Sequence, residues 1–490
     1  MTVSQSWLSL HFRYYVLLAT AASSAFMFSS RCVINFAILA MVTVESNSTL
    51  IIPEAEIGLL PSKAPTLDWD QEQQGIVIGS YHYVYTLLQI STGILADKFD
   101  AVKLTILSHF FASLATLAFP LAATTSYGLA ITLRVLQGLC HAPIFPCCLV
   151  VFENWFTPQE KALAIGAMTF AYNLGTAIVM PVTAWLCING FAGGWPSAFY
   201  CMGIANLIYI ALLYLTVSSN PNDSRLISET EKTLISSYLQ TKPKSKNPTP
   251  WKAMFTSVPL WSATIARGIL STAYNVVNSR IPLYLEIILG YPLQKNGFIN
   301  SAFYLIDACS QLISGPLSRY IASKGYLSLG ATHKLFESIS LLGPACFLLS
   351  IPFLSGRADV IIFGLIMTMF SMGFATGGDI QMVPEIAPAF VGTVFGFSNT
   401  LSCAAGFISP MTIGYILEDQ VFSVDRWNMV FFLFGGLQII GAAQFILFAS
   451  SNPQPWGVIE ETPSKNGDIE MSDKKADKSR DKSVNPRSIN

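Results

Sequence analysis

Long apolar runs dominate this sequence and restrict the folds open to it. A helix needs about 20 mostly apolar residues to cross the hydrocarbon core of a bilayer, and twelve such runs follow one another along the chain. They span residues 14–43, 74–96, 104–123, 127–152, 161–188, 195–217, 259–288, 296–318, 335–354, 358–379, 391–416 and 427–449. Backbone polar groups find no water inside a membrane, so such runs form helices. The sequence therefore predicts an all-α integral membrane protein with twelve transmembrane helices.

Charged residues are scarce, as expected for a membrane protein. Of the 490 residues, 12% are charged and 52% are hydrophobic, whereas soluble domains carry about 25% charged residues. The net charge of −1 and the dispersed basic residues argue against nucleic-acid binding. The first apolar run is too long for a signal-peptide core and no clear small-residue cleavage site follows it, so we expect it to remain in the mature protein.

Basic residues favour one side of the predicted membrane. One side carries Lys98, Lys103, Lys161, the six basic residues from Arg225 to Lys252, Arg319, Lys324, Lys334 and a Lys-rich tail; the other carries Lys63, Lys295, Arg357 and Arg426. The positive-inside rule then predicts that both termini are cytoplasmic. The loop 44–73 would face the lumen or the outside, where the sequon at Asn47 predicts a glycan.

A polar stretch at residues 218–257 divides the runs into two groups of six. We predict a cytoplasmic N-terminus at 1–13, six-helix bundles at 14–217 and 258–449, and between them a cytoplasmic loop with a short surface helix around Ser-Glu-Thr-Glu-Lys. Paired six-span repeats are typical of transporters, whose substrate site lies between the halves at the bilayer midplane. The polar tail 450–490 cannot bury a core and is predicted to be disordered.

An arginine interrupts the first apolar run at position 31. A charged side chain at the centre of a membrane helix costs at least about 2.5–3.5 kcal/mol, and such residues usually face a water-filled cavity or a partner. Asn35 lies one helical turn further along, on the same face. Arg31 is therefore the first candidate for contact with a charged substrate.

Several segments together resemble one family. The stretch GILADKFDAVK (93–103) is similar to the loop between helices 2 and 3 of the major facilitator superfamily. One branch of that family shows the other segments in the same order: RCVINFAILAMV (31–42), TLDWDQEQQGIVIGSYHY (66–83), RVLQGL (134–139), ENWFTPQEK (153–161), PWKAMFTSVPLW (250–261), EIAPAF (385–390) and QPWG (454–457). This branch contains the vesicular glutamate transporters, sialin and the type I sodium/phosphate cotransporters. The resemblance implies an anion carrier that works by alternating access.

The resemblance assigns roles to individual residues. It aligns Arg31 with the arginine thought to face the anion, Arg134 with the fourth-span arginine and Asn399 with the eleventh-span asparagine. In the loop motif, Gly93 would let two helices approach closely, and Asp97 would cap or pair at a helix end beside Lys98.

Three family positions are changed in this sequence. The fourth-span acid tied to proton coupling in sialin-like members is His141 here. The second-span histidine is Ile78, although His82 lies one turn further on. The seventh-span arginine of the vesicular glutamate transporters is Leu270, and Arg267 lies about one turn away. These changes leave the substrate and the proton mechanism open.

Other polar residues within the runs have two readings. Arg267, Ser271, Tyr274 and Asn278 lie on one helical stripe and could line an aqueous wall, so Arg267 and Tyr274 join the substrate-contact candidates; hydrogen bonding between helices would also explain such polar positions. Asp307 stands mid-way along the eighth run. It could bind a coupling proton or pair with Arg267 or Arg31.

The remaining candidate residues also allow both a functional and a structural interpretation. His141 and His82 would couple protons or merely bond neighbouring helices. Arg134 would act in function, or would snorkel or form a structural ion pair.

The leading hypothesis is a secondary active transporter for a small organic or inorganic anion, coupled to protons or sodium, acting as a monomer in contact with lipid and without a cofactor. The cysteines form no CxxC and no metal motif. A membrane enzyme is disfavoured because HExxH, GxSxG and Gly-rich phosphate loops are missing from the sequence. A non-transporting receptor on the same scaffold stays open, as do the anion and the choice between plasma and vesicular or lysosomal membrane.

Overall fold

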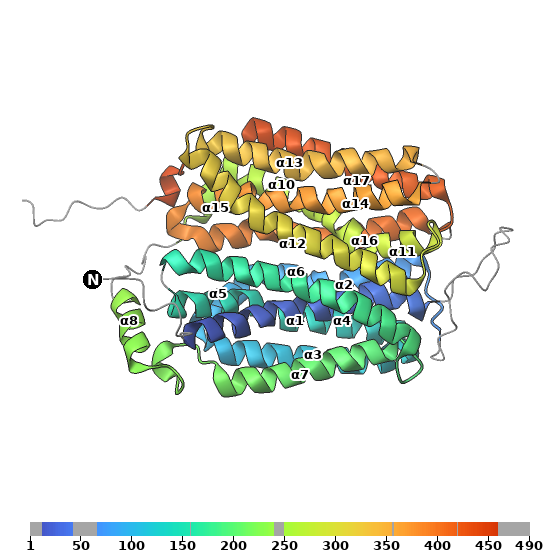
Figure 1. Cartoon of the computed structure of the whole chain (residues 1–490), viewed down its shortest axis with the longest axis horizontal. Helices are drawn as coiled ribbons and strands as arrows, with labels where there is room; N and C mark the ends of the chain where they lie inside the picture. The colour runs from blue at the N-terminus through green and yellow to red at the C-terminus, as the bar shows by residue number, and fades with distance from the viewer. Residues whose placement is uncertain are drawn as a thin grey trace, which may run out of the picture.

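Long helices lie side by side in the computed structural model (Figure 1), which describes residues 12–42, 66–156, 158–239, 249–354, 357–418 and 420–458. The first half contains α1 (Phe12–Met41), α2 (Gln71–Lys98), α3 (Ala101–Thr125), α4 (Tyr127–His141), α5 (Ile144–Trp155), α6 (Pro158–Asn189) and α7 (Pro196–Thr216). Between the halves lie η1 (Pro221–Asp223), α8 (Glu229–Leu239) and α9 (Trp251–Phe255). The second half contains α10 (Val258–Ser279), α11 (Ile281–Ile287), α12 (Leu293–Ser323), α13 (Leu329–Ser350), η2 (Ile351–Phe353), α14 (Ala358–Met372), η3 (Gly373–Gly377), α15 (Asp379–Ile386), η4 (Pro388–Phe390), α16 (Val391–Leu417), α17 (Val424–Phe448) and η5 (Pro455–Gly457).

The two halves form two layers. In Figure 1 the helices of the first half lie below those of the second, with α6 and α12 along the boundary. The halves meet mainly where α2 packs on α16 and α6 packs on α12, and to a smaller extent where α1 meets α10 and α11. We call the end that holds the start of α1 and helix α8 the linker side, and the opposite end, where α1 gives way to α2, the loop side.

Nine helical segments of the described chain are long and apolar enough to cross a membrane. The other three predicted spans coincide with α2, α10 and α12, which are long helices of more polar composition. Helices therefore occupy all twelve predicted positions, while the count of twelve membrane crossings stays a prediction. The all-α class is confirmed for the described residues, which show one isolated β-bridge, between Val42 and Leu67.

Three predicted spans are broken rather than continuous. The fourth is divided between α4 and α5 at Ala142 and Pro143, because proline has no N–H to donate to the carbonyl four residues before it. The seventh is divided at Arg280, just before Pro282. The tenth passes through the 3₁₀ turn η3 and Gly378 before α15 begins. Breaks of this kind free backbone groups that side chains or water must bond, so they concentrate where helices line a pathway.

Small residues let the helices of the first half pack closely. A Cβ atom placed on Gly138 of α4 would stand 2.0 Å from the carbonyl oxygen of Tyr81 on α2, and one on Gly175 of α6 would stand 2.9 Å from Ala25 of α1. Because lipid is as apolar as the side chains, such close van der Waals contact is what holds membrane helices together. Gly138 thereby brings Tyr81 against the face of α4 that carries His141.

Polar contacts fix the linker side of the first half. Asp100, not Asp97, caps α3: it accepts hydrogen bonds from the Lys103 amide at 3.0 Å and from the Ser219 hydroxyl. Burial alone would raise the pKa of Asp100, but these bonds together lower it below its usual value. A surface helix follows in the linker as predicted, and its Glu231 accepts a hydrogen bond from the backbone of Arg13 at 3.1 Å.

The start of the predicted tail packs on the second half. The amide of Gln454 donates to the carbonyl of Ile386 at 2.8 Å, and Gly457 lies so close to Ala387 that a Cβ atom there would be 2.5 Å from its Cα. Residues 459–490 and the predicted glycan site Asn47 lie outside the described residues.

Candidate functional site

Arg31 lies mid-way along α1 and is half-buried. Its guanidinium lies over the ring of Phe28, 4.6 Å from the centroid, and within electrostatic reach of Tyr81, Tyr85 and Tyr304. No described residue gives its side chain a hydrogen bond or an ion pair. Aromatic faces stabilise a cation without using its hydrogen-bond donors, so the donors of Arg31 are available to an anion.

Arg134 supports the backbone at Arg31. It donates to Gln137 at 2.5 Å and to the carbonyl oxygen of Arg31 at 3.5 Å, and it lies over the Tyr81 ring. Gln137 in turn donates to Ser30 at 2.8 Å. No described carboxylate pairs with Arg134, so the centre of the first half carries two arginines without an acid. Its place behind α1 favours a positioning role over direct contact with a substrate.

Three histidines surround this positive centre. The Nδ1 atom of His141 lies 3.0 Å from the Tyr81 hydroxyl, while its Nε2 atom has no partner. His109 of α3, which the sequence reasoning missed, packs 6.1 Å from the His141 ring and has no partner at either nitrogen. His82 faces the other half, where a Cβ atom on Gly406 would meet its ring at 2.4 Å.

Asp307 joins the halves near the middle of the bundle. One of its oxygens accepts hydrogen bonds from Asn173 of α6 at 3.0 Å, from Gln311 at 2.8 Å and from the Tyr274 hydroxyl, while the other oxygen is buried without a partner. It pairs with neither Arg31 nor Arg267. Neutral donors from both halves therefore surround this carboxyl. The Tyr274 hydroxyl bonds Asp307 and does not line an aqueous wall as the helical stripe had suggested.

The predicted asparagines differ in their surroundings. Asn35 donates across the halves to Asn278 at 3.2 Å, and Asn278 also accepts from the Tyr304 hydroxyl. Asn399 is half-buried on α16 and contacts Cys403 of its own helix at 3.4 Å. Asn35 thus contributes to the closed contact between halves beside Arg31.

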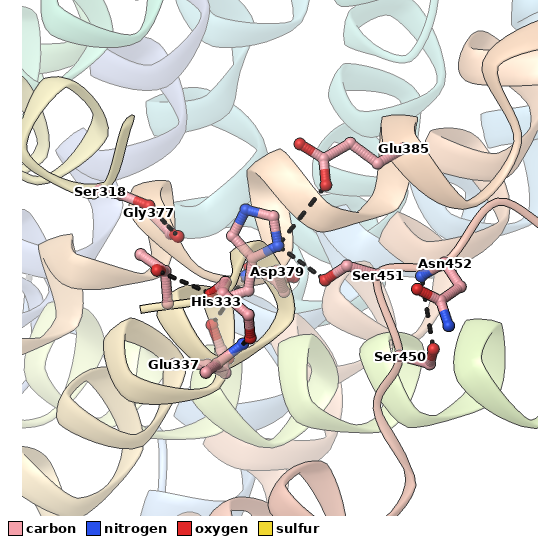
Figure 2. A network of polar contacts seen from close by, with 12 residues as sticks. Ser318, His333, Glu337, Gly377, Asp379, Glu385, Ser450, Ser451 and Asn452 are labelled. Carbon is pink, nitrogen blue, oxygen red and sulfur yellow. Dashed lines mark hydrogen bonds and ion pairs between the residues drawn. The ribbon is translucent and has the colours of Figure 1, made fainter. Parts of the chain in front are cut away.

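Arg267 is paired within its own half. Its Nε atom lies 2.6 Å from the carboxylate of Asp379, and the side chains are 8% and 1% exposed. The amide of Asp379 donates to Glu337 at 3.1 Å, and the Arg267 guanidinium lies over the Phe395 ring of α16. Figure 2 shows Asp379 and Glu337 beside His333. The two central arginines thus differ, since Arg31 is unpaired and Arg267 is held by an acid.

The contact between α2 and α16 is tight on the loop side and does not reach Gly93 near the linker-side end of α2. A Cβ atom on Gly79 would be 3.1 Å from Phe407, and one on Gly414 would be 2.6 Å from the carbonyl oxygen of Gln71. Gly93 lies on the same face as Gly79, about four turns on, and no heavy atom stands within 4 Å of its Cβ position. The predicted close approach at Gly93 does not occur in this arrangement. Lys98, at the end of α2, is exposed, and the Asp97 side chain lies outside the described part.

The contact between α6 and α12 follows the same pattern. A Cβ atom on Gly297 would stand 2.9 Å from Ala184 on the loop side, whereas Gly166, about five turns from Ala184 along α6, faces open space. Gly396 of α16 is open in the same way. The structure is therefore closed towards the loop side and open towards the linker side.

Arg280 fastens the closed side. This fully buried side chain, at the break between α10 and α11, donates to the Gln71 side chain at 3.2 Å, the Gln71 carbonyl at 3.4 Å and the Pro410 carbonyl at 3.2 Å. It connects the second half with α2 of the first. Sequence reasoning missed Arg280, Glu337 and Asp379, although each is a charged residue within or at the end of an apolar run, the same signal that singled out Arg31.

A bundle of two helical halves that is closed on one side, open on the other and centred on an unpaired cation defines a secondary transporter. The chain belongs to the major facilitator superfamily, whose model matches residues 15–410.

Relatives place it in the anion:cation symporter branch. It is 27% identical to sialin of Homo sapiens over 435 residues, covering 87% of each chain. It is 27% identical to vesicular glutamate transporter 3 of Danio rerio, covering 95% of this chain and 78% of that one. A putative inorganic phosphate cotransporter of Drosophila melanogaster is also 27% identical, with 92% and 88% covered. The resemblance read from the motifs is therefore confirmed.

A solved structure supports the fold. A bacterial homologue of the human lysosomal transporter Spinster, in an inward-facing and unoccupied conformation, superposes with a TM-score of 0.68 at 16% identity, covering 91% of this chain and 100% of that one. The protein is thus a multi-pass membrane protein and a secondary transporter. Its relatives are named as transporters, which agrees with the expectation that it is not an enzyme.

Proposed function

We propose that the protein carries a small organic or inorganic anion by alternating access and that Arg31 contacts the anion. The observation that carries the proposal is the half-buried guanidinium of Arg31, which has no described hydrogen-bonding or ionic partner. A guanidinium presents paired donors that match carboxylate and phosphate oxygens. Two of the relatives are named for glutamate and for inorganic phosphate, which are both anions.

The surroundings of Arg31 support this role. Arg134 adds a second positive charge behind α1, and no described carboxylate neutralises either arginine. Cys403 of α16 lies within electrostatic reach of both Arg31 and Arg267, so the two cations border one central region. An anion entering from the linker side would meet a positive potential there. We propose in addition that the linker side is cytoplasmic, from the basic loops, and that transport by the monomer is coupled to protons or sodium, in a plasma or vesicular membrane.

The test is uptake of labelled phosphate, glutamate, aspartate, urate and sialate into liposomes under imposed pH or sodium gradients. Arg31→Ala should remove two charge-assisted hydrogen bonds, each worth about 1.5–3 kcal/mol, and should lower uptake of the transported anion at least about 100-fold with near-normal expression. Arg426→Ala, at a half-buried loop-side arginine, is the matched control and should transport normally. His141→Gln measured beside them tests a proton-coupling role.

Parental uptake by Arg31→Ala would refute the assignment of Arg31. Saturable binding without uptake of any anion would instead favour a receptor.

A further inference from the structure

The cluster of Arg267, Asp379 and Glu337 has an unbalanced charge. Two carboxyl groups, each at most 1% exposed as residues, lie beside one guanidinium. If both acids were ionised, the cluster would hold a net negative charge within a buried site, and burial of an uncompensated charge is strongly unfavourable. Asp379 has the ion pair with Arg267, so we infer that Glu337 is the acid that holds a proton here.

Two buried atoms of the cluster lack partners. The Nη2 atom of Arg267 and one carboxyl oxygen of Glu337 have no hydrogen bond in the described structure. A buried guanidinium donor without an acceptor is costly. The spare donor of Arg267 therefore suits an acceptor that is not part of the resting structure, such as an anion.

Arg267 borders the central pathway. Its guanidinium lies 4.6 Å from the ring centroid of Phe395, and no heavy atom stands within 4 Å of the Cβ position of the next residue, Gly396. Cys403, two turns further along α16, is within electrostatic reach of Arg31 as well as Arg267. An anion bound to Arg31 would therefore lie near the guanidinium of Arg267, which is paired with Asp379.

A chain of polar groups leads from the cluster to the linker side. His333 lies one turn before Glu337 on α13; its Nδ1 atom is 2.8 Å from the Ser451 hydroxyl and 3.6 Å from the carboxylate of Glu385 (Figure 2). The Glu385 side chain is 35% exposed. The Nε2 atom of His333 and one carboxyl oxygen of Glu337 are both buried without a partner, so Glu385 and His333 are the groups through which we infer that a proton from the linker side is supplied to Glu337.

We propose that Asp379 is the coupling site of the transporter and that it competes with the substrate anion for Arg267. This inference rests on the anion-transport function proposed above. In the empty state, the Asp379 carboxylate pairs with Arg267 while Glu337 is neutral. A proton passed from Glu337 to Asp379 breaks the pair, Glu337 is reprotonated through His333, and Arg267 is free to bind the anion.

The charges balance in both states. Empty, the cluster holds one carboxylate, one guanidinium and one neutral acid. Loaded, it holds two neutral acids and one guanidinium, with the anion as the counter-charge. One proton therefore binds with each negative charge of the anion that Arg267 neutralises, and this linkage is the basis of symport.

Among the described residues, few titratable groups lie in or beside this cluster. Arg267 comes from α10, Glu337 and His333 from α13, and Glu385 from its own helix, with Arg319 within electrostatic reach of Glu385. In the described structure, α12 contributes Ser314 and Ser318, which bond the η3 backbone, and α16 contributes Phe395. Asp307 bonds to Tyr274, Gln311 and Asn173, outside this cluster, and is the rival site.

The first experiment measures the pH dependence of binding, with labelled phosphate and glutamate as probes. In the parent, affinity should fall about tenfold per pH unit over the range in which Asp379 titrates. Asp379→Asn should bind with an affinity independent of pH and should exchange anion without being driven by a proton gradient. Glu286→Gln, which changes a carboxyl group of the same half outside the cluster, should behave as the parent does.

The outcomes separate the two proposals. If the parent neither binds nor transports an anion, the proposed function fails. If the parent responds to pH and Asp379→Asn responds equally, or if Asp307→Asn alone becomes uncoupled, the coupling site is wrong while the transport function stands.

A second measurement needs no anion. The infrared C=O band of neutral carboxylic acids in the empty protein at neutral pH should lose one component in Glu337→Gln. An unchanged band in Glu337→Gln would overturn the inference.

Discussion

Arg280→Met should shift the protein towards the state that is open on the loop side. The substitution keeps an unbranched side chain of similar length and removes the three donors that connect α10 to Gln71 and Pro410 at 3.2–3.4 Å. The two bonds to Gln71 exist only while the loop side is closed, because Gln71 lies on α2 of the other half, whereas Pro410 of α16 belongs to the same half as Arg280. When that side opens, water solvates both the arginine and the acceptors.

The magnitude follows from two opposing terms. The two hydrogen bonds from Arg280 to Gln71 contribute about 1.5–3 kcal/mol each, and the burial of the Arg280 charge offsets several kcal/mol of that sum. The net preference for the closed loop side is then about 1–3 kcal/mol, so its loss changes the ratio of the two states about 5–150-fold.

The assay uses a native cysteine. Cys32 is 1% exposed, and its sulfur lies 3.7 Å from Asn278 of the other half. A membrane-impermeant maleimide added on the loop side should label Cys32 at least about 5-fold faster in Arg280→Met than in the parent, with the labelled peptide identified by mass spectrometry. Arg426→Met is the control, because Arg426 bonds Gln420 and Ile416 within its own half. Equal labelling rates in the parent and in Arg280→Met would refute the claim that Arg280 stabilises the closed loop side.

Two further substitutions test stability. Asp307→Asn should keep the fold, because the two lone pairs of its amide oxygen can accept two of the three donors. Asp307→Leu should lose about 2–4 kcal/mol, because all three donors are left unbonded; equal thermal midpoints for the two variants in detergent would contradict this. Asp100→Asn should lower the midpoint at pH 7, and this difference should disappear as the pH falls through the folded pKa of Asp100. The reason is that a carboxyl whose folded pKa is depressed stabilises the fold above its unfolded pKa and loses that effect in acid. A difference that persists in acid would show that the bonds to Ser219 and to the helix cap do not depend on charge.

Arg31 shows what could be predicted from the sequence. An arginine inside an apolar run is costly to place in a membrane unless it faces a cavity or a partner. Its position between the halves could therefore be expected before the fold was known. The same reasoning applies to Arg280 and Asp379, which also lie in or beside apolar runs and were not singled out. A charged residue in an apolar run can be recognised from the sequence, but the sequence does not show which residue pairs with it.

Arg267 shows where prediction fails. Its helical stripe indicated a side chain facing the pathway, yet its ionic partner Asp379 is 112 residues further along the chain. Helical periodicity relates residues three and four apart and cannot pair residues on different helices. For the same reason the donors to Asp307 from α6 and α10 could not be read from its own run, whereas Gln311, four residues further along α12, lies within it.

The two halves carry different charges at their centres, and this difference suggests how anion binding comes to depend on a proton. The first half presents Arg31 and Arg134 without a described acid, so its attraction for an anion depends little on pH. In the second half, Arg267 is available only when Asp379 is neutral. An anion held by Arg31 alone is bound weakly, and a proton that frees Arg267 adds a contact from the opposite half. Because closure of the linker side requires the halves to approach each other, an anion bridging Arg31 and Arg267 would favour that closure, whereas the empty state with both charges facing each other would oppose it.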